Sequence, residues 1–232
     1  MSLESDLERA RALSVDDLAD AIEAIGFECT RCGGCCTATE PAVDPDEAES
    51  AGRTDTASGG DPHTATLFPA EIRQLQATGE YDFRDVARPM PYGLDEGGQS
   101  GETFEWALQT DPCGNCTFYE ESDGVGACTV HEDRPLICQT YPFSVALDST
   151  VQPMGEAVDE DGMVRAHECE GLGREISRED ARDLARRLKE RAIRELEEAI
   201  GVRDNYRSVD RSEGEVVVHD SEGPKRPDGT EF

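Results

Sequence analysis

The chain of 232 residues fits one large domain or two small ones, and it combines 52 Asp and Glu with 22 Lys and Arg and nine Cys. Its formal net charge of -30 at pH 7 excludes non-specific binding to nucleic acid or to an anionic membrane, because both would repel it. Arg greatly outnumbers Lys, a balance typical of proteins from extreme halophiles, in which salt screens the acidic surface.

No stretch approaches the ~20 apolar residues of a transmembrane helix, and the charged N-terminus lacks the apolar region of a signal peptide. We therefore expect a cytoplasmic protein whose thiols are reduced. In that setting nine Cys indicate metal or redox chemistry rather than a disulfide framework.

In chain order, segment 1–26 is expected to be helical, because its apolar residues recur at helical spacing. Ser14 and Asp17 resemble a capping box, and Gly26 can end the helix. This segment leads directly into the first cysteines.

The central segment, residues 27–173, is expected to form a metal-binding domain. Its acidic stretch 41–64 predicts a solvated loop, and residues 69–81 regain a helical pattern. Short strands are expected at 103–108 and 143–147.

The segment 174–202 carries the longest helical pattern, which Ser177 and Asp180 cap and which Gly201 is expected to end. Residues 203–232 are acidic and are expected to form a flexible, peripheral tail. The fold class is therefore α+β, a small metal-organised domain with short strands and loops around a cysteine cluster and helices at its flanks.

The cysteines are the strongest signal in the sequence. Two residues between ligands let a tight turn aim two sulfurs at one metal, and Gly33 and Gly34 offer the positive φ that such turns need. Three sulfurs at successive two-residue intervals can hold three corners of an Fe–S cubane, with a remote Cys as the fourth. One zinc ion takes four ligands, so nine Cys suffice for two sites. The nine are Cys29, Cys32, Cys35, Cys36, Cys113, Cys116, Cys128, Cys138 and Cys169.

Cys35 and Cys36 are adjacent, and neighbouring side chains in extended backbone point to opposite sides. We therefore expect that the two do not bind one ion together. They could bridge two sites, or one sulfur could lie outside the cluster.

Four histidines bear on the ligand set. His131 and His167 lie close in sequence to cysteines, and either could replace a thiol at zinc. His63 falls in the acidic loop and His219 in the tail, so both are expected in solvent.

The segments FECTRCGGCC, CTFYEESDGVGACTVHEDRPLICQTYPF and CEGLG resemble the CxxCxxCC cysteine-cluster family of the YkgJ type, over roughly residues 27–173. That family is described as zinc- or iron-chelating and is often labelled as containing Fe–S clusters. The resemblance leaves Cys113 over and implies metal ligation by eight cysteines, namely Cys29, Cys32, Cys35, Cys36, Cys116, Cys128, Cys138 and Cys169.

Arg134 lies between two of these cysteines and precedes Pro135. An Arg beside thiolates can offset their charge and donate hydrogen bonds to sulfur, which would make it a cofactor-binding residue. The alternative is a surface Arg before a turn-forming Pro. His131, Gln139 and Glu170 depart from the residues usual in the family, but none of these departures removes a ligand.

Three functions follow as hypotheses. In the first, Cys29, Cys32 and Cys35 with one distant Cys hold a [4Fe–4S] cluster for electron transfer or as part of an Fe–S oxidoreductase. In the second, one or two all-cysteine zinc sites serve structure or partner binding without catalysis. In the third, an exposed and labile site sequesters or delivers metal. The expected partner is a protein, and the sequence identifies no catalytic residue.

Overall fold

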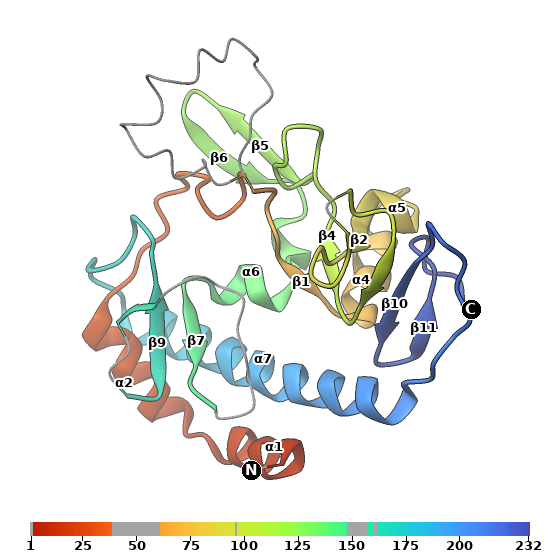
Figure 1. The fold of residues 1–232 in the computed structure, drawn as a ribbon. Helices are drawn as coiled ribbons and strands as arrows, with labels where there is room; N and C mark the ends of the chain where they lie inside the picture. Colours follow the sequence, from red (N-terminus) through yellow and green to blue (C-terminus); the bar gives the residue numbers. More distant parts are fainter. Residues whose placement is uncertain (1, 39–60, 96, 148–156, 160–161) are drawn as a thin grey trace, which may run out of the picture.

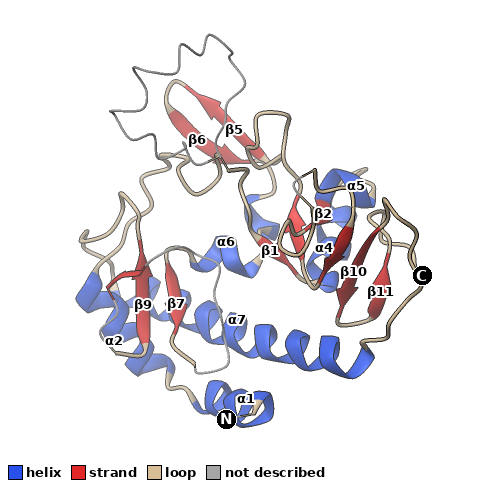
Figure 2. Ribbon diagram, in the orientation of Figure 1, coloured by secondary structure: helices blue, strands red, loops and turns tan. Residues whose placement is uncertain are grey.

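The computed structural model describes residues 2–38, 61–95, 97–147, 157–159 and 162–232. Most of the predicted acidic loop therefore lies outside the described residues. Figures 1 and 2 show helices together with several small sheets, so the fold is α+β as predicted. The helices are α1 (Leu3–Ala12), α2 (Val15–Ile25), α4 (Pro69–Thr78), α5 (Phe83–Val86), α6 (Leu136–Thr140) and α7 (Arg178–Asn205), with the 3-10 helix η1 (His131–Asp133).

Within the described residues, the strands are short and form four separate sheets. They are β1 (Thr66–Leu67), β2 (Ala87–Pro89), β3 (Gly101–Thr103), β4 (Trp106–Leu108), β5 (Tyr119–Ser122), β6 (Val125–Cys128), β7 (Phe143–Val145), β8 (Ala157–Asp159), β9 (Val164–His167), β10 (Val216–Asp220) and β11 (Gly223–Lys225). The strand orders are β1-β4-β2, β11-β10-β3, β5-β6 and β7-β9-β8.

Helix α7 is the longest element and organises one half of the molecule. Its apolar stripe, which includes Leu188, Ala192 and Leu196, is buried against α1, α2 and the β7-β9-β8 sheet. In Figure 1, α7 crosses the picture with α1 below it and with β7 and β9 near its left end. No helix in the described ranges is both long and apolar enough to cross a membrane.

Local signals in the sequence set the starts of these helices. The Ser14 hydroxyl accepts a hydrogen bond from the Asp17 amide at 3.2 Å, and Gly26 ends α2 with a φ of 78°. Ser177 caps α7 in the same way through Asp180. Gly201, however, lies inside α7 and does not end it. A Cβ there would lie 2.7 Å from Cβ of Ser221, so this glycine permits a close approach to the β10–β11 turn.

A second core lies beneath the β1-β4-β2 sheet and α4. Trp106 in this core is 1% exposed. Its ring meets the Phe83 ring in a T-shaped arrangement, with 4.8 Å between ring centroids. Its indole N–H donates to Asp220 at 2.9 Å. This core also receives cysteines from the neighbouring hairpin and from α6.

The expectation of a flexible tail over 203–232 is corrected by β10 and β11. Strand β10 pairs parallel with β3 and antiparallel with β11, and all five of its residues are buried. Lys225 lies 3.0 Å from the Asp220 carboxylate. The valine run at the start of β10 therefore adds a strand to the fold, because it finds an edge more than 100 residues earlier in the sequence.

Candidate metal centre

The first cysteines follow α2 on a segment that pairs with the chain around Cys169. Phe27 forms a β-bridge with Leu172, and the Glu28 amide donates to the Gly171 carbonyl at 3.0 Å. The Gly173 amide donates in turn to the Gly26 carbonyl at 3.0 Å. These bonds join segments about 140 residues apart and bring Cys169 beside the start of the cysteine loop.

The cysteine loop, residues 29–36, turns sharply before its last two cysteines. Gly33 has a φ of 78°, and its carbonyl accepts from the amides of Cys36 and Thr37 at 2.7 and 3.1 Å. The backbone here is a turn rather than a strand, and the sulfurs of Cys35 and Cys36 lie 3.8 Å apart. The prediction that these side chains point to opposite sides is therefore wrong, because it assumed extended backbone.

The β5–β6 hairpin holds the other side of the cysteine loop. The Cys36 carbonyl accepts from the Cys116 amide, and the Arg31 carbonyl accepts from the Gly126 amide, each at 2.8 Å. Cys128 ends β6 directly opposite Tyr119 on β5. Backbone pairing thus places Cys36, Cys116 and the hairpin against one another.

Cys138 is supplied by the short helix α6, which a half-buried carboxylate and a buried guanidinium anchor. The Glu71 carboxylate accepts from the amides of Leu136 at 2.8 Å and Phe68 at 3.0 Å, and burial raises the pKa of this carboxyl. At the other end of α6, the Arg191 guanidinium donates to the Thr140 hydroxyl at 3.0 Å. The sequence analysis missed both residues, because a buried charge has no local sequence signature.

A nearby cysteine raises the pKa of a thiol through charge repulsion, and these effects show which cysteines lie close together. The Cys169 thiol interacts electrostatically with Cys35, Cys32 and Cys29. The structure thus brings together one set of four thiols on the cysteine loop and the Cys169 turn.

The Cys138 thiol interacts instead with Cys116, Cys35 and Cys128. These neighbours form a second set, and Cys35 lies between the two. All eight cysteines implied by the family resemblance are therefore brought into one region. Cys113 is not among them, since it is exposed and its amide donates to the Asp111 carboxylate at 2.8 Å.

Five of these thiols have pKa values above that of a free cysteine, so without a cation they stay protonated; they are Cys35, Cys116, Cys128, Cys138 and Cys169. Burial raises the pKa of Cys116 to about 11 and raises the pKa of Cys128, Cys138 and Cys169 as well. The contact with the Cys36 thiol raises the pKa of Cys35. Because metals bind thiolates, metal uptake here must release protons.

Arg134 provides positive charge close to the thiols of Cys35 and Cys128. It lowers the pKa of both Cys35 and Cys128 against the stronger effects that raise them, and its Nε donates to the His131 carbonyl at 3.0 Å. Its charge therefore favours the thiolate form of these two cysteines.

The two histidines that lie close in sequence to cysteines pair with oxygen atoms. His131 is exposed and lies 3.2 Å from the Glu132 carboxylate, and His167 pairs with the Ser144 hydroxyl at 2.9 Å. The expectation that His63 and His219 lie in solvent is corrected. Nε2 of His63 is buried, and His219 is 1% exposed within β10.

The donor set fits both metals named in the hypotheses. Four thiolates close a zinc site, and four thiolates also hold a [4Fe–4S] cluster. In the described part of the chain, however, no three Cys, His, Asp or Glu side chains already converge on one ion position. The fit thus rests on the gathering and chemistry of the thiols, and metal binding requires their side chains to move closer together.

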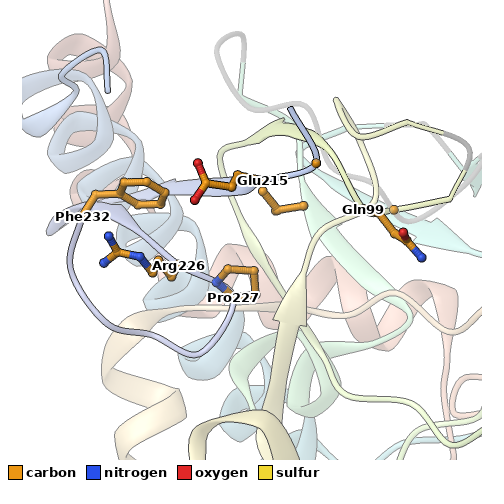
Figure 3. A pocket seen from close by; sticks show the side chains of 8 residues that line it. Gln99, Glu215, Arg226, Pro227 and Phe232 are labelled. Carbon is orange, nitrogen blue, oxygen red and sulfur yellow. The ribbon is translucent and has the colours of Figure 1, made fainter. Parts of the chain in front are cut away.

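A pocket of about 430 Å³ lies elsewhere, beside β10 and β11. Figure 3 shows Glu215, Arg226 and Phe232 around it, and the Arg226 guanidinium lies 4.3 Å from the centre of the Phe232 ring. No cysteine lines this pocket. It is therefore separate from the thiol region.

No significant match was found among curated proteins or among solved structures. A family model matches residues 28–170, which is more than half of the chain, and its description is "Putative zinc- or iron-chelating domain". The match spans all nine cysteines and therefore supports metal binding through them. On this evidence, the chain belongs to the CxxCxxCC family of zinc- or iron-chelating domains.

Proposed function

We propose that the protein holds an Fe–S cluster, with [4Fe–4S] favoured, and serves in electron transfer or as a redox-enzyme component. One observation carries the proposal. The pairing of Glu28 with Gly171 brings Cys169 beside the loop cysteines Cys29, Cys32 and Cys35, whose spacing lacks only a remote fourth ligand. Cys29, Cys32, Cys35 and Cys169 would hold the cluster.

When bound, such a cluster would take up and release single electrons. The protein's own residues would set where this happens. Cys29, Cys32 and Cys35 are exposed, so a partner could approach them closely. Arg134 would stabilise added negative charge. Given the net charge of -30, we expect the electron partner to be a protein with a basic surface.

A zinc protein without catalysis is the second candidate. It is favoured by Cys116, which is 7% exposed, and by Cys138, because both pack in the Trp106 core. Structural zinc sites have four protein ligands and no open coordination position, which suits buried thiols. A binding or structural role would follow if zinc filled every site.

The test is anaerobic purification in high salt, followed by iron, zinc and acid-labile sulfide analysis and visible absorption. The proposal expects iron and sulfide in near-equal amounts and a brown colour that dithionite bleaches. Cys169→Ser should lose that iron, whereas Cys113→Ser should retain it. Colourless protein that contains zinc alone would overturn the Fe–S assignment.

A further inference from the structure

The eight gathered cysteines do not form one continuous group. Backbone hydrogen bonds from Glu28 to Gly171 and from Gly173 to Gly26 hold the Cys169 turn against the cysteine loop, and the Cys169 thiol interacts with loop cysteines. Cys116, Cys128 and Cys138 pack in the Trp106 core, and each of their thiols interacts with one loop cysteine, Cys35. Two sets of three thiols therefore flank the adjacent pair Cys35 and Cys36. The first set is Cys29, Cys32 and Cys169, and the second is Cys116, Cys128 and Cys138.

Packing and backbone contacts place Cys36 with the core set, whereas the Cys35 thiol interacts with thiols of both sets. Cys36 packs against the Trp106 core together with Cys116, Cys128 and Cys138. Its carbonyl also accepts from the Cys116 amide at 2.8 Å. Cys35 is absent from that core and is exposed. The two sulfurs, 3.8 Å apart, lie side by side at the boundary.

We propose that Cys36, Cys116, Cys128 and Cys138 form a second, separate metal site, a buried four-cysteine site that binds zinc. The site is independent of the metal that the exposed set, Cys29, Cys32, Cys35 and Cys169, holds. Each set has four thiols, the number that closes a tetrahedral zinc site.

The choice of zinc for the second set follows from its surroundings. Its four ligands come from four short segments, namely a turn, a bridge after β4, the end of β6 and the five-residue helix α6. None of these segments is long enough to be stable alone, so a metal that joins them would serve the fold. Zinc takes up no electrons and keeps a closed, four-coordinate geometry, as this role requires.

Thiol footprinting of the metal-loaded protein tests the division without any substitution. The unmodified, anaerobically purified chain is alkylated with iodoacetamide before and after treatment with a zinc chelator, and in a parallel sample after oxidative loss of the exposed metal. We expect Cys36, Cys116, Cys128 and Cys138 to become reactive together on zinc chelation. In the parallel sample we expect Cys29, Cys32, Cys35 and Cys169 to become reactive together. Cys113 should react throughout and serves as the internal control.

Two matched Cys-to-Ser variants provide a second test of the division. Cys128→Ser should lose one zinc per chain and retain the metal of the exposed set, whereas Cys32→Ser should do the reverse. If the exposed set also binds zinc, the Fe–S proposal fails while the division survives, with two zinc ions per chain and one lost in each variant. Simultaneous reactivity of all eight thiols, or loss of the same metal in both variants, would show one shared cluster and overturn the second site.

Discussion

The molecule has two halves that are stabilised in different ways. The helical half, formed by α1, α2, α7 and the β7-β9-β8 sheet, encloses one continuous apolar core. The cysteine half, formed by the cysteine loop, the β5–β6 hairpin, η1 and α6, consists of elements of three to five residues and an irregular loop. The first half contains a helix of 28 residues, and the longest helix of the second has five.

This difference indicates how each half acquires its stability. Burial of apolar side chains stabilises the helical half directly. In the cysteine half, backbone hydrogen bonds join short segments, and Cys116, Cys128 and Cys138 pack with Phe118 and Val130 in the Trp106 core rather than in a core of their own. A bound metal would add to these contacts, since metal-binding free energy becomes folding free energy when the site forms only on folding.

The largest expected effect comes from removing a ligand of the cysteine half. Cys138→Ser should lose metal and unfold the hairpin and α6, because structural zinc sites contribute about 10–16 kcal/mol of apparent binding free energy. Hydrogen exchange should then show loss of protection at the Cys116 and Gly126 amides, while α7 remains protected. Cys113→Ser is the control and should change neither. Full metal content and unchanged protection in Cys138→Ser would contradict the comparison.

A substitution in the apolar core of the helical half should lower stability without changing metal binding. Leu188→Ala removes a side chain that is 1% exposed in the apolar core, and it should lower the free energy of unfolding by about 2–5 kcal/mol. Metal content per folded chain should stay the same, because no cysteine contacts this core. Denaturant unfolding and elemental analysis on the same sample measure both quantities. Glu190→Ala on the exposed face of α7 should change stability by less than about 0.5 kcal/mol.

A pH effect of intermediate size is expected from His63. Burial, and then the charge of Arg88, lower the pKa of His63 from 6.5 to about 4. The unfolded chain therefore binds this proton more readily, so stability is complete above pH 6.5 and declines as pH falls toward 4. The loss should reach at most about 3 kcal/mol.

Unfolding curves of His63→Gln measured between about pH 7 and pH 4 test this effect. The variant should lose that part of the pH dependence. His131→Gln, at an exposed position, should retain it. A pH profile in His63→Gln that matches the unmodified chain would show that another group causes the acid sensitivity.

The helices were predictable because their signals are local. Ser14 and Ser177 each bond an amide three residues later, as their sequences predict. Contacts distant in sequence were not predictable in this way. Gly201 has the sequence context of a helix end but fits a close contact with Ser221, and the valine run of β10 pairs with a strand far earlier in the chain.

The cysteine spacing likewise predicted metal chemistry but not which cysteines lie next to one another. Which remote cysteine joins the loop depends on the pairing of Glu28 with Gly171, and no local pattern encodes that pairing. The relation of Cys35 to Cys36 depends on the conformation of a turn, which the cysteine spacing alone does not specify. Of the two glycines expected to provide positive φ, only Gly33 has it, whereas Arg31 adopts a φ of 57° that its residue type does not suggest.

The smallest expected effect separates these two glycines. In Gly33→Ala, the new Cβ would lie 2.1 Å from the Tyr119 hydroxyl oxygen, and the residue would have to keep a φ of 78°. The left-handed backbone alone costs about 1–2 kcal/mol for an L-residue with a side chain. In Gly34→Ala, the new Cβ would meet only the Cys32 sulfur, at 3.7 Å, so this variant is the matched control. Thermal unfolding of the metal-loaded protein should show a lower midpoint for Gly33→Ala alone, together with faster metal loss to a chelator. If both variants behaved alike, the turn at Gly33 would not position the cysteine loop, and the contact with Tyr119 would have to be accommodated by movement of the hairpin.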